Sequence, residues 1–315
     1  LNMKLSNLIS DYYLSFDFNS LRKETKVQYQ YFLGVLSNTK LGDSQKLGTC
    51  KLQDVSSRVA KKAYEQWCGR GVSLANHTVS VARVVYNYAI EMETYTVNPF
   101  TGIKKRKSIA RKVVWSKEDV IRFLDTAYSN FSTRNIGLIA QMAYEWCQRL
   151  GDMRVIMWDN VDLDKGTMHI EQSKRRAEVF LPISDDLCAM LKQQNLEFGF
   201  QPYIAPRTKA FKGVYRPYSL YELPKLARHI MDSADLSKEL RLSDLRRTGT
   251  VEMVDAGVSM GNIMSVTGHA NPQSVKPYMK NTFASANLAL QKRQGLTENK
   301  THATSIKHAD KERFI

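Results

Sequence analysis

Five residues in the second half of the chain have side chains that together can cleave a phosphodiester: Arg149, Lys174, Arg246, His269 and Tyr278. A phosphodiester repels nucleophiles, and its transition state spreads extra negative charge over the non-bridging oxygens. Two guanidinium groups can bind those oxygens through paired, charge-assisted hydrogen bonds, and arginine stays charged at any working pH. Such a pair acts as an oxyanion hole does. These residue types favour metal-free cleavage.

Tyr278 is the candidate nucleophile of this set. A free phenol has a pKa of roughly 10, so only about one phenol in a thousand is ionised at neutral pH. Nearby positive charges are what could make a phenol reactive. Attack by a tyrosine would hold the cleaved strand as a covalent phosphotyrosine, which stores the bond energy, so that rejoining needs no ATP.

The last part of the chain carries short motifs in a fixed order. Residues 242–248 read Leu-Ser-Asp-Leu-Arg-Arg-Thr, residues 256–258 read Ala-Gly-Val, residues 267–269 read Thr-Gly-His, and a Pro-Tyr pair stands at 277–278. The tyrosine lies nine positions after the histidine. This order resembles the C-terminal signature of the tyrosine recombinases, the phage integrase family. In that signature an arginine opens a helix, a glycine-histidine pair follows, and the nucleophilic tyrosine comes last.

A second resemblance lies upstream. Residues 149–152 read Arg-Leu-Gly-Asp, and Trp158 follows nine residues after the arginine, as in the first-arginine motif of the same family. A chance match to one motif is plausible, whereas several motifs in the correct order favour membership.

The resemblance assigns a role to a lysine on a β-hairpin turn, which gives a proton to the leaving 5′-oxygen. Residues 167–172 alternate like a strand, residues 179–182 are typical of its return, and residues 173–178 form the predicted turn. Lys174 lies in that turn and is the candidate. Its neighbours Arg175 and Arg176 leave open that the position is displaced by one residue.

The resemblance further implies that His269 hydrogen-bonds the phosphate and that Asp152, one helical turn from Arg149, orients that guanidinium. One position departs from the family. Its second-arginine motif usually reads His-x-x-Arg, but the residue three before Arg246 is Ser243. A serine hydroxyl cannot be protonated near neutral pH as an imidazole can. The acid–base part of the mechanism is therefore in doubt at Ser243.

Each candidate also has an ordinary structural explanation. An arginine and an aspartate three apart on a helix usually form a surface pair worth a few tenths of a kcal/mol. Gly268 and His269 can end a helix, where glycine is favoured and histidine meets the dipole. Tyr278 is one of fifteen tyrosines, and Lys174 can belong to a solvated turn. The joint spacing favours the catalytic interpretation.

Positive charge is concentrated in the first third of the chain. Residues 1–113 contain 18 Lys and Arg against 8 Asp and Glu, whereas the remaining 202 residues contain 28 against 23. This distribution is expected of a part that grips a polyanion. The densest cluster predicts a basic linker at 101–113 that lies on DNA, although a solvated tether has the same composition. The predicted DNA-binding residues are Lys104, Lys105, Arg106, Lys107, Arg111 and Lys112 in the linker, and Arg175 and Arg176 in the hairpin turn.

Residues 1–100 have a helical pattern throughout. The spacing predicts helices at 5–14 and 21–36, a third capped by Ser56 and ended by Gly69, and a fourth that starts at Ser73. Four helices on a basic segment of this size resemble the family's core-binding domain, which clamps the DNA face opposite the catalytic domain. Little sequence precedes the first helix, so we expect the family's additional arm-binding domain to be absent or trimmed.

Residues 114–295 predict the catalytic domain. A capping box starts at Ser116, a long helix leads to Arg149, the hairpin follows, and helices continue to the end. A further helical stretch at 284–291 would, in the family, dock on a neighbouring protomer. The polar residues 296–315 lack periodicity and are expected to be mobile. The predicted fold class is mainly α with a small β-sheet (α+β): an N-terminal helical core-binding domain plus a tyrosine-recombinase catalytic domain.

Composition excludes several other classes of protein. The four cysteines are scattered without C-x-x-C spacing, which suggests neither a zinc site nor a disulfide framework but reduced thiols in a cytoplasmic protein. No uncharged apolar run approaches the roughly 18 residues of a membrane span, and the N-terminus has no signal-peptide pattern. The chain has no Gly-rich phosphate loop and no carboxylate set suited to Mg²⁺, so we expect no metal or other cofactor.

The family resemblance implies site-specific recombination between two double-stranded DNA attachment sites. A homotetramer would exchange one pair of strands, pass through a Holliday junction and exchange the second pair, and DNA-bending accessory proteins could take part. Integration is the expected outcome. A resolvase, a transposon recombinase or a type IB topoisomerase-like enzyme would use the same chemistry, and Ser243 leaves open a non-catalytic DNA-binding regulator. The sequence contains no information on the target site or on the direction of recombination.

Overall fold

The computed structural model describes residues 3–42, 45–109, 111–174, 176–279, 286–287 and 289–294. The chain divides into two compact units, Leu1–Arg111 (unit 1) and Lys112–Ile315 (unit 2). Arg175 and the tail at 296–315 lie outside the described residues. Of the helical stretch predicted at 284–291, residues 286–287 and 289–291 are described, and these are helical.

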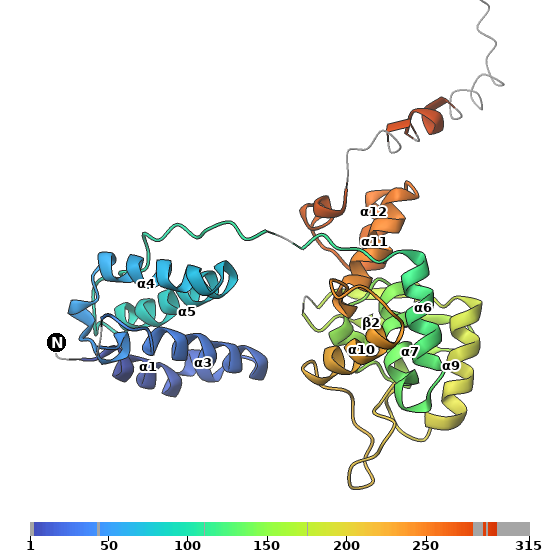
Figure 1. The fold of residues 1–315 in the computed structure, drawn as a ribbon, viewed down its shortest axis with the longest axis horizontal. Coiled ribbons are helices and arrows are strands. Elements are labelled where there is room, and N and C mark those ends of the chain that lie inside the picture. The colour runs from blue at the N-terminus through green and yellow to red at the C-terminus, as the bar shows by residue number, and fades with distance from the viewer. Residues whose placement is uncertain are drawn as a thin grey trace, which may run out of the picture. The chain divides into compact units, whose positions relative to one another are not determined.

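The described part of unit 1 is built from helices (Figure 1): α1 (Leu5–Leu14), α2 (Phe16–Asn19), α3 (Lys23–Ser37), α4 (Ser57–Arg70) and α5 (Val72–Glu91), with 3₁₀ turns at Leu47–Thr49 and Leu52–Asp54. Apolar side chains recur at helical spacing and meet in one core around the fully buried Trp67 and Phe100. Ser56 caps α4 as predicted, because its hydroxyl accepts from the Val59 amide at 3.3 Å.

Three predicted helices in unit 1 have boundaries that were wrong by one or two residues. The helix predicted at 21–36 is α3, Lys23–Ser37. Helix α4 does not end at Gly69 but continues to Arg70, and the chain turns at Gly71, whose φ is 147°. Helix α5 consequently begins at Val72 rather than at Ser73. Gly69 and Gly71 could each end a helix, but only Gly71 has a backbone conformation that favours glycine.

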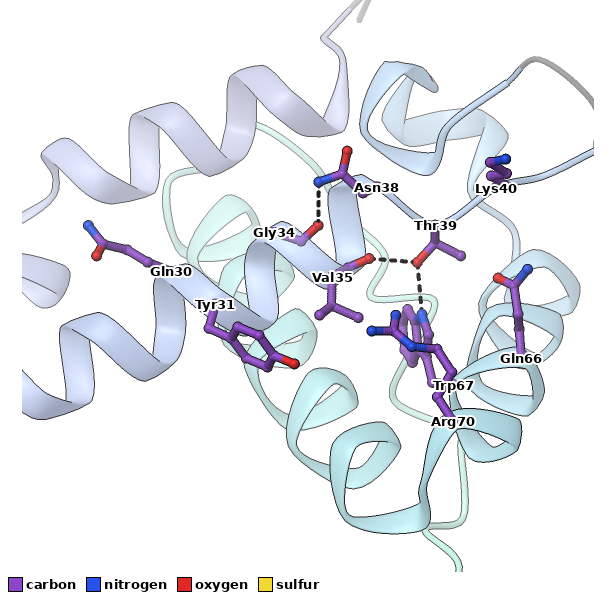
Figure 2. A pocket seen from close by; sticks show the side chains of 10 residues that line it. All are labelled: Gln30, Tyr31, Gly34, Val35, Asn38, Thr39, Lys40, Gln66, Trp67 and Arg70. Carbon is purple, nitrogen blue, oxygen red and sulfur yellow. Dashed lines mark hydrogen bonds between the residues drawn. The ribbon is translucent and has the colours of Figure 1, made fainter. Parts of the chain in front are cut away.

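A groove of about 580 Å³ with a mixed polar and apolar lining opens between α3 and α4. Figure 2 shows its floor, where the Thr39 hydroxyl donates to the Val35 carbonyl and accepts from the Trp67 indole, each at 2.8 Å. The side chains around it are mainly amides and cations, namely Gln30, Asn38, Lys40, Gln66 and Arg70. Such groups can hydrogen-bond to polar edges of a partner.

Tyr86 carries a buried hydroxyl at the centre of unit 1. Its side chain is fully buried, and among the described residues no group lies within hydrogen-bonding distance of its oxygen. Burial is the main reason that the pKa of Tyr86 is raised far above 10. Tyr86→Phe should therefore raise the free energy of unfolding of unit 1 by about 1 kcal/mol, because it removes a desolvated polar group that gains no bond.

Thermal unfolding of the intact chain measures this change. Tyr64→Phe is the matched control, because the Tyr64 hydroxyl donates to Asn76 Oδ1 at 2.7 Å and accepts from the Arg106 amide at 2.6 Å. The control should unfold at a lower temperature than the unsubstituted protein. A Tyr86→Phe variant that also unfolds earlier would contradict this explanation.

The described part of unit 2 combines helices with one small sheet. Its elements are α6 (Lys117–Tyr128), α7 (Phe131–Glu145), α8 (Leu150–Met153), β1 (Val161–Asp162), β2 (Thr167–Glu171), β3 (Glu178–Pro182), α9 (Asp185–Phe198), α10 (Glu222–Ser233), α11 (Leu245–Asp255) and α12 (Met260–Thr267), with 3₁₀ turns at Trp158–Asn160, Leu242–Asp244, Pro272–Ser274 and Lys276–Tyr278. The strands are antiparallel in the order β1-β2-β3. The predicted fold class, mainly α with a small β-sheet, is confirmed.

Period-two alternation sets the orientation of the sheet. Met168 and Ile170 on β2 pair with Leu181 and Val179 on β3, and all four side chains are buried in the core of unit 2. The side chain two positions after Ile170 should therefore also point inward. That position is occupied by the polar Gln172.

Helix α11 is held close to the end of α7. A Cβ atom on Gly249 would lie 2.7 Å from both the Cys147 Sγ and the Tyr144 carbonyl oxygen, so only glycine permits this approach. On the other side, the Trp115 amide donates to the Thr248 hydroxyl at 3.0 Å. The start of α11, which carries Arg246, is thereby fixed next to the segment that carries Arg149.

The first part of the predicted linker is attached to unit 1. The Arg83 guanidinium donates to the carbonyls of Phe100, Thr101 and Ile103. Lys105 donates to the Ser80 hydroxyl, and the Arg106 amide donates to Tyr64. In the part of the chain that the structure describes, no helix has the length and apolar character needed to cross a membrane.

Candidate active site

Arg149 precedes α8 and points its guanidinium toward β2. Its Nη1 donates to Gln172 Oε1 at 2.7 Å and lies 3.9 Å from Asp152 Oδ2. Asp152 is buried, and its Oδ1 accepts from the Ser173 amide at 3.1 Å. The nearer partner of Arg149 is therefore a neutral amide, while Asp152 holds the hairpin and contributes its charge from a greater distance.

Arg246 lies in the first turn of α11 and is largely buried. Its Nη2 donates to the Thr267 carbonyl at 2.8 Å and to His269 Nε2 at 3.3 Å. Its Nη1 is buried and has no hydrogen-bond partner among the described residues. Burial, followed by the positive charge of Arg149, lowers the pKa of Arg246 to about 10, so the group remains charged at neutral pH. A desolvated, charged donor of this kind needs an anionic acceptor.

His269 follows the end of α12, where Gly268 adopts a left-handed conformation with φ of 68°. The Thr267 hydroxyl donates to the Ile263 carbonyl at 2.7 Å, so toward His269 Nδ1, also at 2.7 Å, it acts as an acceptor. This chain of bonds assigns the proton of the neutral ring to Nδ1. The lone pair of Nε2 then faces Arg246.

Tyr278 ends the 3₁₀ turn at Lys276–Tyr278, which the fully buried Val275 anchors. Its ring centroid lies 6.2 Å from that of His269, and the Arg247 guanidinium lies 4.8 Å from the ring centroid. The tyrosine is partly exposed and surrounded by cationic groups, which is the environment that a phenolic nucleophile requires.

Lys174 is exposed on the turn between β2 and β3. The two residues before it are fixed, because the Gln172 side chain and the Ser173 amide are both hydrogen-bonded within the site. The base of Lys174 therefore lies at the edge of the site. Arg176 in the same turn pairs with Glu171 at 2.8 Å.

The other predicted residues are mainly exposed. Ser243 is exposed in the 3₁₀ turn that precedes α11. The basic residues Lys104, Lys105, Arg106 and Lys107 belong to unit 1 and are exposed, as is Lys112 in unit 2, whereas Arg111 is half-buried. Arg175 lies outside the described residues.

The described residues offer neither a metal-binding cluster nor a reactive cysteine thiol near these side chains. Across the described ranges, no cluster of three or more His, Cys, Asp or Glu residues is arranged to hold a metal ion. Cys147 lies behind α11, but burial raises the pKa of its thiol to about 11. A buried thiol that is protonated at neutral pH is a poor nucleophile.

The sequence patterns did not identify Gln172. It is fully buried and bonds to Arg149, to Gln148 and to the Thr267 carbonyl. The available signal was its position, since a polar residue in the inward register of an amphipathic strand must find partners inside the protein.

Comparisons with known proteins give a family and a fold. The model of the phage integrase family matches residues 114–285. A lambda integrase dimer bound to a COC′ core site has 17% identity and a TM-score of 0.73, over 89% of this chain and 78% of that one. A lambda integrase tetramer bound to a Holliday junction has 16% identity, with the same TM-score and coverage. The Tn1549 transposon integrase in complex with a circular intermediate DNA has 14% identity and a TM-score of 0.73, over 92% and 99%. At these identities the likeness shows a shared fold. No curated protein sequence matches.

Proposed function

The chain belongs to the phage integrase family, the tyrosine recombinases, and we propose that it cleaves and rejoins DNA at specific sites through a 3′-phosphotyrosine intermediate. The observation that carries this proposal is the buried, charged Nη1 of Arg246, which has no hydrogen-bond partner among the described residues and belongs to the cluster that contains Arg149, His269 and Tyr278. A scissile phosphate would supply the missing acceptor.

The reaction begins when Arg149 and Arg246 bind the non-bridging oxygens of the phosphate. The Tyr278 oxygen attacks phosphorus, the bond from phosphorus to the 5′-oxygen breaks, and Lys174 gives that oxygen its proton. The phenolic proton passes to His269 Nε2, and the imidazolium can then donate to a phosphate oxygen. Rejoining reverses these steps, with a 5′-hydroxyl as the attacking group.

Two DNA attachment sites must be brought together for strand exchange. We propose a homotetramer that passes through a Holliday junction, in the cytoplasm and without a metal or nucleotide cofactor; accessory DNA-bending proteins would assist where sites are distant. The similarity to a lambda integrase tetramer bound to a Holliday junction supports this assembly. Integration of phage DNA is the outcome we favour.

The test is a covalent protein–DNA adduct. The protein is mixed with a pool of duplexes that carry a randomised central segment, the reaction is stopped with a denaturing detergent, and adducts are separated on a denaturing gel. Sequencing of the attached DNA gives the cleavage site. Absence of any adduct would contradict the proposal and favour a non-catalytic regulator.

Transposon recombination is the second candidate, because the Tn1549 transposon integrase matches with the same TM-score as lambda integrase. A circular intermediate formed from a plasmid with two recovered sites would favour it. Relaxation of a one-site plasmid without exchange would instead indicate a resolvase-like or topoisomerase-like activity.

Neutralising the exposed linker residues Lys104, Lys105, Arg106 and Lys107 should weaken binding to unrelated DNA about as much as binding to the true site, because phosphate contacts have no sequence information. If the cluster contacts about three phosphates, the slope of log K against log salt should fall by roughly 2 to 3. Replacement of the exposed Lys165, Lys192 and Lys238 by glutamine is the control, with an unchanged slope expected. An unchanged slope in the linker variant would identify the segment as a tether.

A further inference from the structure

Gln172 uses both ends of its side-chain amide inside the protein. Its Oε1 accepts from Arg149 Nη1 at 2.7 Å, and its Nε2 donates to Gln148 Oε1 at 2.6 Å and to the Thr267 carbonyl at 2.9 Å. Both amide hydrogens are therefore bonded. A rotated amide would turn its NH₂ toward a guanidinium and its oxygen toward two acceptors, so only the observed orientation is favourable.

The Thr267 carbonyl receives a second bond. Arg246 Nη2 donates to the same oxygen at 2.8 Å. One carbonyl is thus shared by Arg246 and by the amide that holds Arg149. Through it the two guanidinium groups are placed relative to each other, although they lie on segments almost 100 positions apart.

Neighbouring atoms restrict the position of the Gln172 side chain. A Cβ atom on Gly268 would lie 2.6 Å from Gln172 Nε2, and the Gln172 backbone is fixed by bonds to the turn at Ala177 and Arg176. Only Ser173 stands between Gln172 and Lys174 in the sequence. Any displacement of Gln172 would therefore move both Arg149 and the hairpin turn.

The chemical nature of the acceptor matters. A carboxylate at hydrogen-bonding distance would orient a guanidinium but would also offset its charge, and it would compete with the phosphate. A neutral amide orients the guanidinium and leaves its full positive charge available. Asp152, the nearest carboxylate to Arg149, stays at 3.9 Å and has its other oxygen bonded to the Ser173 amide.

We propose that Gln172 is a positioning residue for DNA cleavage: it holds Arg149 in its phosphate-binding orientation and couples it to Arg246 through the Thr267 carbonyl. This inference rests on the proposed function. Gln172 is fully buried, so it would align the side chains that bind DNA without contacting DNA itself.

Gln172→Met tests the proposal, because methionine has a similar size but provides none of the three bonds. Single-turnover cleavage is measured on a nicked duplex of the recovered site, and DNA affinity is measured separately. We expect the cleavage rate to fall at least about tenfold, since small displacements of a clamp cost that much or more. DNA affinity should change less than about threefold, because most phosphate contacts lie elsewhere.

Gln194 provides a matched control in the same unit. It is also buried, accepts from Arg134 at 3.4 Å, and donates to Asn135 Oδ1 at 3.0 Å and to the Ile204 carbonyl at 2.9 Å. Gln194→Met removes the same kinds of bond away from the site. It should lower the unfolding temperature as Gln172→Met does and leave the cleavage rate unchanged.

A double-mutant cycle distinguishes positioning from a general loss of structure. If Gln172 acts through Arg149, Gln172→Met should cause no further loss of cleavage in an Arg149→Ala background. Equal fold losses in both backgrounds, or a cleavage rate for Gln172→Met equal to that of Gln194→Met, would overturn the inference.

If the methionine variant does not fold, Gln172→Glu takes its place. Its cleavage rate should also fall at least about tenfold, since the charge of the glutamate offsets that of Arg149. Unchanged cleavage by that variant would equally overturn the inference. Failure of the proposed function is distinguishable, because the unsubstituted protein would then form no adduct.

Discussion

Tyr278→Phe should abolish the covalent protein–DNA adduct while DNA binding persists. The substitution removes the attacking oxygen and keeps the ring, whose packing against His269 and Arg247 does not require the hydroxyl. The expected loss is therefore complete within the sensitivity of the assay.

The adduct is trapped on a nicked duplex and separated on a denaturing gel, with binding measured by mobility shift. Tyr221→Phe is the control, since Tyr221 is an exposed tyrosine of the same unit that contacts Lys225. An adduct that survives in Tyr278→Phe would mean that another residue attacks the phosphorus, and the assignment of the nucleophile would be wrong.

Arg246→Ala should slow cleavage by at least about a hundredfold, because it removes a desolvated positive donor from the transition state. Ser243→Ala should cost less than about tenfold, which corresponds to one neutral hydrogen bond of about 1 kcal/mol. The difference follows from burial, since Arg246 is largely buried against Thr267 and His269 whereas Ser243 is exposed.

Single-turnover rates of the two variants, corrected for DNA affinity, measure this difference. Arg246→Lys keeps the charge but cannot replace a planar group that donates in several directions, so it should remain strongly impaired. A loss at Ser243→Ala as large as that at Arg246→Ala would show that the serine organises the site, and that the departure from the family pattern changes the mechanism.

Local sequence patterns were sufficient for much of the fold. Ser56 and Ser116 cap helices as expected, because a cap depends only on residues within one turn. The hairpin that carries Lys174 was predicted from alternation and a polar turn, and its strands are present. The motif order brought Arg149, Arg246 and His269 into one hypothesis, and their side chains lie in one hydrogen-bonded cluster. Their catalytic roles stay predictions.

Contacts between segments that are distant in the sequence could not be predicted from it. From the sequence, Gln172 is only a polar residue at the end of a strand. Its role depends on the carbonyl of Thr267, which is 95 positions away in the sequence but accepts a hydrogen bond from it. In the same way, Arg83 reads as a surface cation, although its guanidinium fixes the start of the linker. Nothing in the local spacing encodes which backbone carbonyl a long side chain will reach.

The buried guanidinium of Arg246 has a consequence for the balance between activity and fold stability. Burial and the charge of Arg149 lower its pKa from the usual range of arginine to about 10, which corresponds to about 3 kcal/mol against the charged form in the folded state. Because the pKa of Arg246 is lower in the folded state than in the unfolded state, this penalty is present at all pH values below about 10 and is relieved as the pH rises toward the pKa of the unfolded state. The protein without DNA thus keeps two like charges close together in a desolvated place. If Arg246 binds the scissile phosphate as proposed, the protein accepts this cost in stability in exchange for the reaction.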